Sequence, residues 1–355
     1  MPGYPTHRSW QSFDRVRLTD EPGMRLKQTM RKLLIFLLLL LASASFAQFV
    51  APQLSSKDAI RIREFYNLIP QVAEQVWPNW IKTPAPLLLV TQETEFLTHF
   101  AHPPEDFKKI ADDLYARPRH FPTGMQATFP AFGPPSIIVI GEAEDTEAKR
   151  STPWLFVLMH EHFHQLQDSQ PGFFEAVKEL GLAHGDETGM WMLNYPFPYE
   201  KPELDQSFAQ LRDLLVEALQ EQNDEKFRLK AQRYAAERKK FFSALSPDDR
   251  KYLSFQLWKE GIARYVQIKS AEAAAQYRPA PEFAALSDYE TFGSYAARAR
   301  SDTLNELRQA DLAKWQRIVV YSFGAGEGLL LDRFSPKWRD GYFRQLFTLD
   351  PYFEN

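Results

Sequence analysis

Three histidines fall within five residues of an otherwise apolar segment, and no other feature constrains the fold of this chain as strongly. Residues 154–166 read WLFVLMHEHFHQL. On a helix, the apolar side chains of this segment cover nearly every side, so the helix is expected to be buried. Buried imidazoles need partners, because they lose their hydrogen bonds to water. The sequence therefore predicts a buried helix whose histidines share a partner.

The segment contains the pattern H-E-x-x-H, filled by His160, Glu161 and His164. Residues four apart lie one turn above each other, so the two imidazoles point toward one place, as the first two ligands of a zinc ion do. Glu161 lies one step round the helix, where it can take a proton from an activated water. We expect His162 to point away from the pair and to be structural. The alternative is a solvated or self-paired histidine cluster without metal.

Local signals place this helix after a strand. Thr152 is the expected N-cap and Pro153 the first helical residue. Residues 136–141, SIIVIG, form the clearest predicted strand, and a polar connection leads from it to the helix. That strand is expected beside the histidines, either as an edge on which a peptide pairs its backbone or as core.

The remaining chain indicates a mainly helical α+β fold. We expect a helix over 56–76, which Pro70 divides or kinks, and short strands within 84–91 and 125–132. Residues 93–116 are predicted to be mainly helical. Apolar spacing over 204–218 and 227–241 predicts a helical hairpin inside an insertion of about 171–245. Residues 314–334 start as an apolar helix and run into a glycine-rich turn.

A catalytic zinc site normally has three protein ligands, so two histidines need a third. We favour Glu260, on a helix that begins with Ser246 as N-cap and Pro247 at its first position. A carboxylate on the apolar stripe of such a helix is rarely buried unless it is paired or bound to metal. Gly261 follows it, and the close approach of another helix or of a substrate would explain a missing side chain there. The alternative partner of Glu260 is a Lys or Arg.

A second set of candidates for the third ligand lies closer to the motif. His184, Asp186 and Glu187 follow His164 by 20 to 23 positions, in a glycine-rich setting that is less helix-like. Whichever of the two, Glu260 or this set, does not bind the metal would line the cleft.

These two motifs together resemble the gluzincin metallopeptidases, the broad group that contains thermolysin and the zinc aminopeptidases. The later segment, W-K-E-G-x-A-x-Y over 258–265, resembles a large set of bacterial peptidase-like proteins. The resemblance covers about 136–168 and 250–332. It implies a zincin-like fold with a small N-terminal sheet and a large helical C-terminal part, Zn²⁺ on His160, His164 and Glu260, and Glu161 as the base. The 96 positions between His164 and Glu260 exceed the thermolysin spacing, which the helical insertion would explain.

Gluzincin-like families often present a tyrosine or histidine that steadies the oxyanion. By that resemblance Tyr321 is the candidate and Tyr265 the reserve. Tyrosines at such positions are more often core residues with one satisfied hydroxyl, and this alternative stays open for both.

Charge and cysteine content exclude several classes. The chain has no cysteine, so disulfides and thiolate metal sites are impossible. Its net charge is −4, and no basic tract suggests a nucleic-acid partner. The resemblance to metallopeptidases implies a peptide or protein substrate instead, and the sequence does not specify the oligomeric state.

Residues 1–47 have the composition of a signal peptide. Seven Lys or Arg stand against three Asp or Glu, and the apolar run 33–41 ends in ASASFA before Gln48. This run is too short for a stable membrane anchor, which takes about 20 residues, so cleavage after Ala47 or Ala44 and a periplasmic or secreted location are expected. Met24 or Met30 would be a more usual start for such a segment. The remaining 48–355 are predicted to form one domain.

The combined prediction is an exported zinc metallopeptidase that hydrolyses a peptide or amide bond. Two alternatives stay open: a non-catalytic zincin-like protein that binds a cell-envelope partner, and a helical scaffold in which the motif is accidental.

Overall fold

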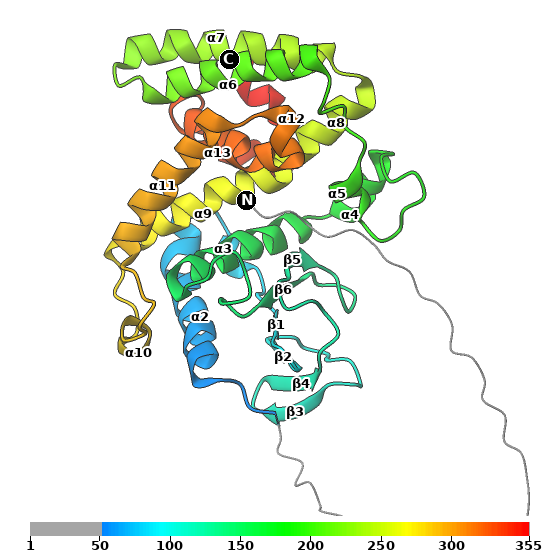
Figure 1. Cartoon of the computed structure of the whole chain (residues 1–355), viewed down its shortest axis with the longest axis vertical. Helices are drawn as coiled ribbons and strands as arrows, with labels where there is room; N and C mark the ends of the chain where they lie inside the picture. The colour runs from blue at the N-terminus through cyan, green and yellow to red at the C-terminus, as the bar shows by residue number, and fades with distance from the viewer. Residues whose placement is uncertain (1–51, 355) are drawn as a thin grey trace, which may run out of the picture. The chain divides into compact units, whose positions relative to one another are not determined.

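A mixed sheet and a larger group of helices lie on either side of one helix, α3 (Ser151–Asp168), in the computed structural model (Figure 1). The structure describes residues 52–354. The mixed α+β class expected from the sequence is confirmed, and most of the described residues are helical. The helix α3 carries the H-E-x-x-H residues, so the motif lies where the two parts of the fold meet.

The sheet has six strands in the order β3-β4-β2-β1-β6-β5. Only β1 and β6 pair in parallel, and the other neighbours are antiparallel. The strands are β1 (Leu87–Val90), β2 (Thr94–Thr98), β3 (Lys108–Ala111), β4 (Leu114–Pro118), β5 (Gln126–Phe129) and β6 (Ile137–Gly141). The predictions of strands within 84–91, 125–132 and 136–141 are confirmed. The expectation that 136–141 forms an edge is wrong, because β6 lies between β1 and β5, and β5 is the edge beside α3.

The two parallel strands, β1 and β6, are buried on both faces. Leu87, Leu89, Ile138 and Ile140 face the main core beneath α3, and the alternate residues face a smaller aromatic cluster. This second cluster combines residues of β1, β2 and β6 with Phe100 and Phe107 from the loop between β2 and β3. Buried parallel strands of this kind read as continuous apolar runs, which is why their sequence signal is clear.

The prediction of helix over 93–116 is wrong, because these residues form β2, β3 and β4. Glu95 shows why the local pattern misleads. Its carboxylate is buried, accepts a 2.7 Å hydrogen bond from Arg117 Nε, and also accepts from the backbone N–H groups of His120 and Phe121. A charged residue that resembles a solvated helix face is thus a satisfied core residue of a strand. The pairing that decides this is not local in sequence.

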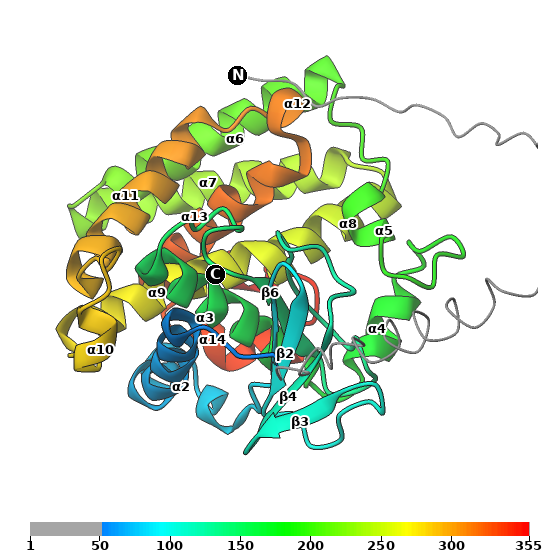
Figure 2. The same cartoon turned by 60° about the horizontal axis from the view of Figure 1, so that its bottom comes forward.

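The helical part starts with α2 (Ser56–Val76), which has the predicted bounds and runs unbroken through Pro70. Figure 2 shows α2 beside α3 and the sheet. The short elements are η1 (Trp80–Lys82), α4 (Phe173–Glu179), α5 (Trp191–Asn194), η3 (Ala274–Gln276), α10 (Pro281–Ala284), α12 (Leu312–Trp315), η4 (Gln316–Ile318), α14 (Trp338–Gly341), η5 (Tyr342–Arg344) and η6 (Asp350–Phe353). The long helices are α6 (Pro202–Gln220), α7 (Asp224–Ala244), α9 (Ile262–Ala273), α11 (Phe292–Gln309) and α13 (Val319–Phe334), with α8 (Pro247–Gln256) leading into a π-helical turn, η2 (Leu257–Gly261).

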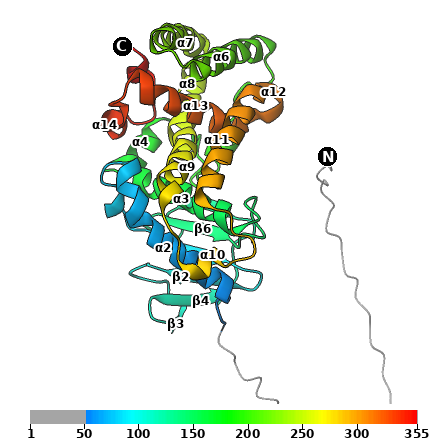
Figure 3. The same ribbon diagram turned by 90° about the vertical axis from the view of Figure 1, so that its left-hand side faces the viewer.

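The predicted helical hairpin is confirmed as α6 and α7, which pack against each other at the far end from the sheet (Figure 3). Both helices also pack on α13. Buried Glu327 of α13 accepts hydrogen bonds of 2.5 Å from Tyr234 and Arg238 of α7. The hairpin is therefore held against α13, the helix that carries Tyr321.

The start of α3 differs from the prediction. Arg150 occupies the N-cap position without a capping side chain, and Thr152 lies inside the helix. Its hydroxyl donates to the backbone oxygen of Glu290, while the Ser151 hydroxyl donates to Asp288 at 2.9 Å. These hydroxyls bind a distant loop instead of capping their own helix, which local sequence rules cannot anticipate.

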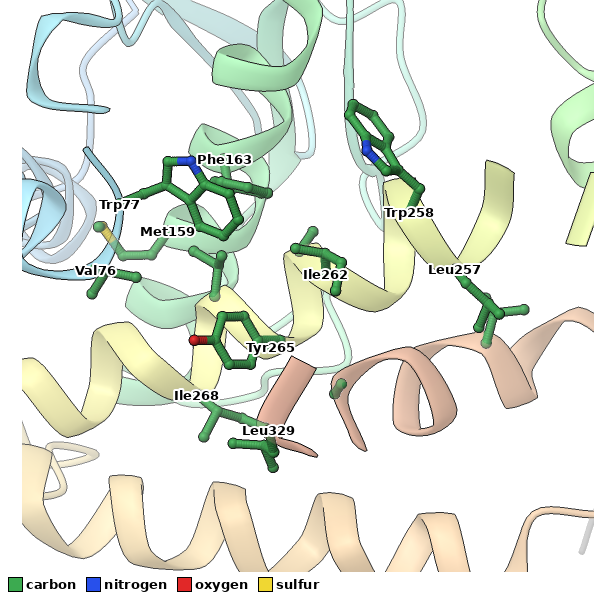
Figure 4. Close-up of a cluster of buried hydrophobic side chains, with 14 of the residues drawn as sticks. Val76, Trp77, Met159, Phe163, Leu257, Trp258, Ile262, Tyr265, Ile268 and Leu329 are labelled. Carbon is green, nitrogen blue, oxygen red and sulfur yellow. The ribbon is translucent and has the colours of Figure 1, made fainter. Parts of the chain in front are cut away.

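The expected glycine-rich turn after Tyr321 is wrong, because α13 continues as one helix to Phe334. Its glycines allow close packing. A Cβ on Gly324 would lie 2.5 Å from Gly261 Cα, and one on Gly328 would lie 2.7 Å from the Tyr265 ring. Of the two reasons offered for the missing side chain at Gly261, the structure shows the close approach of another helix. Figure 4 shows the apolar side chains that fill this region, with Tyr265 and Leu329 between α9 and α13, and Trp77 and Phe163 on the α3 side.

Among residues 52–354, no helix combines the length and apolar character required to cross a bilayer. The predicted signal peptide, residues 1–47, lies outside the described residues.

Candidate metal centre

Two helices bring the predicted ligands together. His160 and His164 lie one turn apart on α3, and Glu260 comes from the π-helical turn η2. The two imidazole Nε2 atoms are 3.1 Å apart, and Glu260 Oε2 lies 3.7 Å from that of His160 and 3.4 Å from that of His164. Within residues 52–354 no other group of three His, Asp or Glu brings its ligand atoms this close.

These separations fit a metal ion. Zinc binds nitrogen and oxygen at about 2.0–2.1 Å, so two ligands of a tetrahedral shell are about 3.3 Å apart. The three separations lie close to that value. Nitrogen and carboxylate oxygen are also the donor types that zinc takes when no cysteine is present. The residues present therefore fit a zinc ion with three protein ligands and one open position.

The local structure explains why Glu260 reaches the histidines. A π-helical turn carries one more residue per turn than an α-helix and is frequent at functional sites. Within it, Lys259 points to Asp168 at the end of α3, and Glu260 points to the imidazoles. The alternative of a Lys or Arg partner for Glu260 does not occur among the described residues, because the neighbouring lysine has its own carboxylate.

The charges of the three groups are strongly coupled. Burial would raise the pKa of Glu260, but the two imidazoles outweigh burial and hold it well below its ordinary value. Burial lowers the pKa of His160, while that of His164 is raised because Glu260 outweighs burial and the charge of Lys259. Glu260 is thus an ionised carboxylate in a buried site. A divalent cation would compete with protons for the imidazole nitrogens of this site.

Gln167 orients one ligand and binds both helices. Its amide nitrogen donates to the backbone oxygens of Trp258 and Lys259, at 3.2 and 3.1 Å, and also contacts Tyr342 Oη. The amide oxygen therefore faces His164 Nδ1, 2.6 Å away. In the neutral ring this places the proton on Nδ1 and leaves the Nε2 lone pair toward Glu260, as in known metal sites with an oriented histidine. The Nδ1 of His160 has no such partner among the described residues.

Glu161 lies beside the cluster and belongs to no ligand group. Its side chain is buried, and Thr128 Oγ1 of the edge strand β5 donates to its Oε2 at 2.8 Å. One carboxylate oxygen is thereby held, and the other has no hydrogen bond to a described residue. The Glu161 oxygen without a hydrogen bond can therefore accept a proton at a fixed position.

Of the two tyrosine candidates, only Tyr321 lies near the histidines. The Tyr321 ring lies 6.2 Å from that of His160, and Arg317 donates to its hydroxyl at 3.4 Å. Burial and the charge of Glu260 raise the pKa of Tyr321, so it keeps its proton at neutral pH. The reserve candidate Tyr265 donates to Asp332 at 2.7 Å and packs in the core, away from the cluster.

The alternative ligands are placed elsewhere. His184 and Glu187 are exposed, and neither joins a cluster of metal-binding groups among the described residues. Asp186 accepts from the backbone N–H groups of Thr188 and Trp191, so it closes its own loop. His162 is buried against Trp80 and pairs with Gln165 at 2.9 Å, as expected of a structural residue.

No protein-family model, curated protein or solved structure matches the chain. The assignment of a function therefore depends on the site itself.

Sequence reasoning missed three residues of this region: Thr128, Gln167 and Arg317. Gln167 had a usable signal, because it follows His164 by three positions and so shares its helix face. Arg317 precedes Tyr321 by four positions and is close to it in space. Thr128 had none, since its pairing with Glu161 depends on how the sheet packs on α3.

Proposed function

We propose that the chain is a zinc-dependent metallopeptidase of the zincin-like type, exported through the signal peptide expected at residues 1–47. One observation carries the proposal: His160, His164 and Glu260 converge from helices 96 positions apart, and Glu161 is held beside them. A chance H-E-x-x-H has no reason to meet a carboxylate from another helix at ligand separations.

The sheet supports the same function. The strand β5 pairs with β6 on one side, and its other side is the open edge of the sheet. Its side chains are half-buried, and Thr128 within it touches Glu161. An extended peptide that adds to this edge by backbone hydrogen bonds would lie along α3. We propose that the substrate peptide binds there.

The chemistry follows from the positions of the side chains. His160, His164 and Glu260 would hold zinc, which, when bound, supplies Lewis-acid activation of water and of the scissile carbonyl. Glu161 accepts the proton of the attacking water at the oxygen that Thr128 leaves unoccupied, and later passes it to the leaving amine. Tyr321, protonated at neutral pH, donates a hydrogen bond to the oxygen on which negative charge develops.

The first test is metal content. Purified protein should contain one zinc per chain by elemental analysis, and Glu260→Ala should lose it. Glu187→Ala is the matched control, because it removes an exposed carboxylate of the alternative ligand set and should keep the metal. Loss of zinc in the control with retention in Glu260→Ala would overturn this ligand assignment.

The second test is turnover. Glu161→Gln should keep one zinc and lower the hydrolysis of a mixed-sequence peptide library by about 100- to 10,000-fold, because the general base is removed. Unchanged hydrolysis in this variant would refute the mechanism. Zinc binding by the wild type without hydrolysis of any peptide would instead favour the non-catalytic binding protein.

A further inference from the structure

Among the residues that the structure describes, Arg317 lacks the carboxylate partner that each of the three fully buried arginines has. Arg61, Arg117 and Arg238 each donate to a carboxylate, at 2.9, 2.7 and 2.5 Å respectively. Arg317 is half-buried, yet no carboxylate of the described residues lies within 4.0 Å of its guanidinium. Its two hydrogen bonds are long, 3.4 Å each, and go to the neutral Gln256 Oε1 and Tyr321 Oη. Burial would lower the pKa of the Arg317 guanidinium, and nearby charges, that of Glu260 included, raise it instead. No carboxylate oxygen within residues 52–354 forms an ion pair with this partly desolvated cation.

The position of Arg317 connects it to the candidate metal centre. The Tyr321 ring centroid lies 6.2 Å from the His160 ring and 5.5 Å from Arg317 Cζ. Gln256, the other hydrogen-bond partner of Arg317, donates to the backbone oxygen of Met192, and Tyr252 donates to the same oxygen. Neutral groups therefore hold the guanidinium beside the candidate metal centre. Its N–H groups can donate further hydrogen bonds to an anion.

The backbone before Arg317 supports a specific placement. Gln316 has φ +47° and ψ −130°, a region that residues with a side chain rarely adopt. Such a conformation persists only where the surroundings hold it, and it occurs preferentially at functional sites. It turns the chain after α12, so that Arg317 lies in η4, immediately before the helix α13 that carries Tyr321.

We infer that Arg317 receives the C-terminal carboxylate of a peptide, so that the substrate is cleaved within one or two residues of its C-terminus. This inference depends on the proposed peptidase function and specifies its substrate class. Arginine suits the role, because its planar guanidinium binds a carboxylate through two parallel hydrogen bonds. The two distances that meet at the Tyr321 ring place Arg317 Cζ no more than about 12 Å from the His160 ring. An extended chain advances about 3.3–3.6 Å per residue, so a tail of one or two residues, with a hydrogen-bonded contact to Arg317, fits within this limit.

The test compares two probes that differ only at the C-terminus, benzoyl-Gly-Phe and its amide. The wild type should hydrolyse the acid with a kcat/KM about 10- to 100-fold above that of the amide, the effect expected of hydrogen bonds to a charged group. Arg317→Gln should bring this ratio close to one. Arg317→Lys, which keeps the charge and loses the two-pronged geometry, should give an intermediate ratio. Arg308→Gln removes an exposed arginine elsewhere and should keep the wild-type ratio.

An equilibrium-binding arm separates the two proposals. The same probes are titrated into Glu161→Gln, with and without Arg317→Gln, and the acid should bind about 10- to 100-fold more tightly only when Arg317 is present. If this preference holds but no peptide is hydrolysed by the wild type, the peptidase function fails and the carboxylate site stands. Equal binding of acid and amide, no binding of either probe at its solubility limit, or an equal loss for both probes in Arg317→Gln would overturn the inference.

Discussion

Replacing Gly261 by alanine should damage the site through one methyl group. A Cβ at this position would lie 2.6 Å from Gly324 Cα and 2.9 Å from the backbone oxygen of Val320. Both obstacles are backbone atoms of α13, so no change of rotamer relieves the clash. The helices η2 and α13 must move apart, and Glu260, the adjacent residue, moves with η2.

The cost of Gly261→Ala can be estimated from two opposing effects. Overpacking of this kind costs about 1–3 kcal/mol, and backbone obstacles place this case at the upper end. Alanine in place of glycine inside a helix returns about 1 kcal/mol. We therefore expect the free energy of unfolding to fall by about 2 kcal/mol. A displacement of Glu260 should also weaken zinc binding by at least about tenfold, because ligand geometry tolerates only about 0.5 Å.

Urea unfolding and a competitive zinc titration measure these two effects. Gly293→Ala is the matched control, because its Cβ would meet only the backbone oxygen of Ala275 at an ordinary 3.7 Å. The control should be neutral or slightly more stable than the wild type. Equal stability and equal zinc affinity in Gly261→Ala and Gly293→Ala would refute the reasoning.

Two further perturbations test the groups around the motif. Gln167→Leu removes the acceptor at His164 Nδ1 and the donor to η2, so zinc affinity in a competitive titration should fall by about 10- to 100-fold, whereas unchanged affinity would show that Gln167 does not orient the ligand. Burial lowers the pKa of His162 from 6.5 to about 4, so the unfolded chain binds a proton in that interval that the folded chain does not. Stability should therefore fall by up to about 3 kcal/mol as the pH drops from 6.5 to 4, and be unaffected by His162 above 6.5. In denaturant unfolding across this range, His162→Asn should show a shallower acid loss, and an equally steep loss would assign the effect to other groups.

The sequence was informative where one local pattern decides the structure. The bounds of α2, the cap at Ser246 and the apolar strand β6 follow from spacing, capping and continuous hydrophobicity. The H-E-x-x-H spacing also placed His160 and His164 together, because a helix alone fixes the distance between residues four apart.

The sequence was misleading where contacts between residues far apart in the chain decide the structure. Residues 94–98 become a strand because β1 and β4 lie on both sides of them. The glycines of α13 resemble a turn when read locally, but they are helical because other helices require the space. Arg317 carries no signal of its own, because its position beside Tyr321 and its lack of an ion pair with a described residue are visible only in the folded structure.

Lys259 and Glu260 illustrate how the fold resolves what the sequence leaves open. Adjacent residues of opposite charge do not face each other on a helix, so each needs a partner elsewhere. Asp168, held by a 2.7 Å hydrogen bond from Ser136, takes Lys259. This pairing removes the cation that would otherwise compete for Glu260, and it does so at the end of the helix that carries the histidines. The carboxylate is left with imidazoles as its partners, and a site with two neutral nitrogen donors and one anion is better suited to a divalent cation than to a proton.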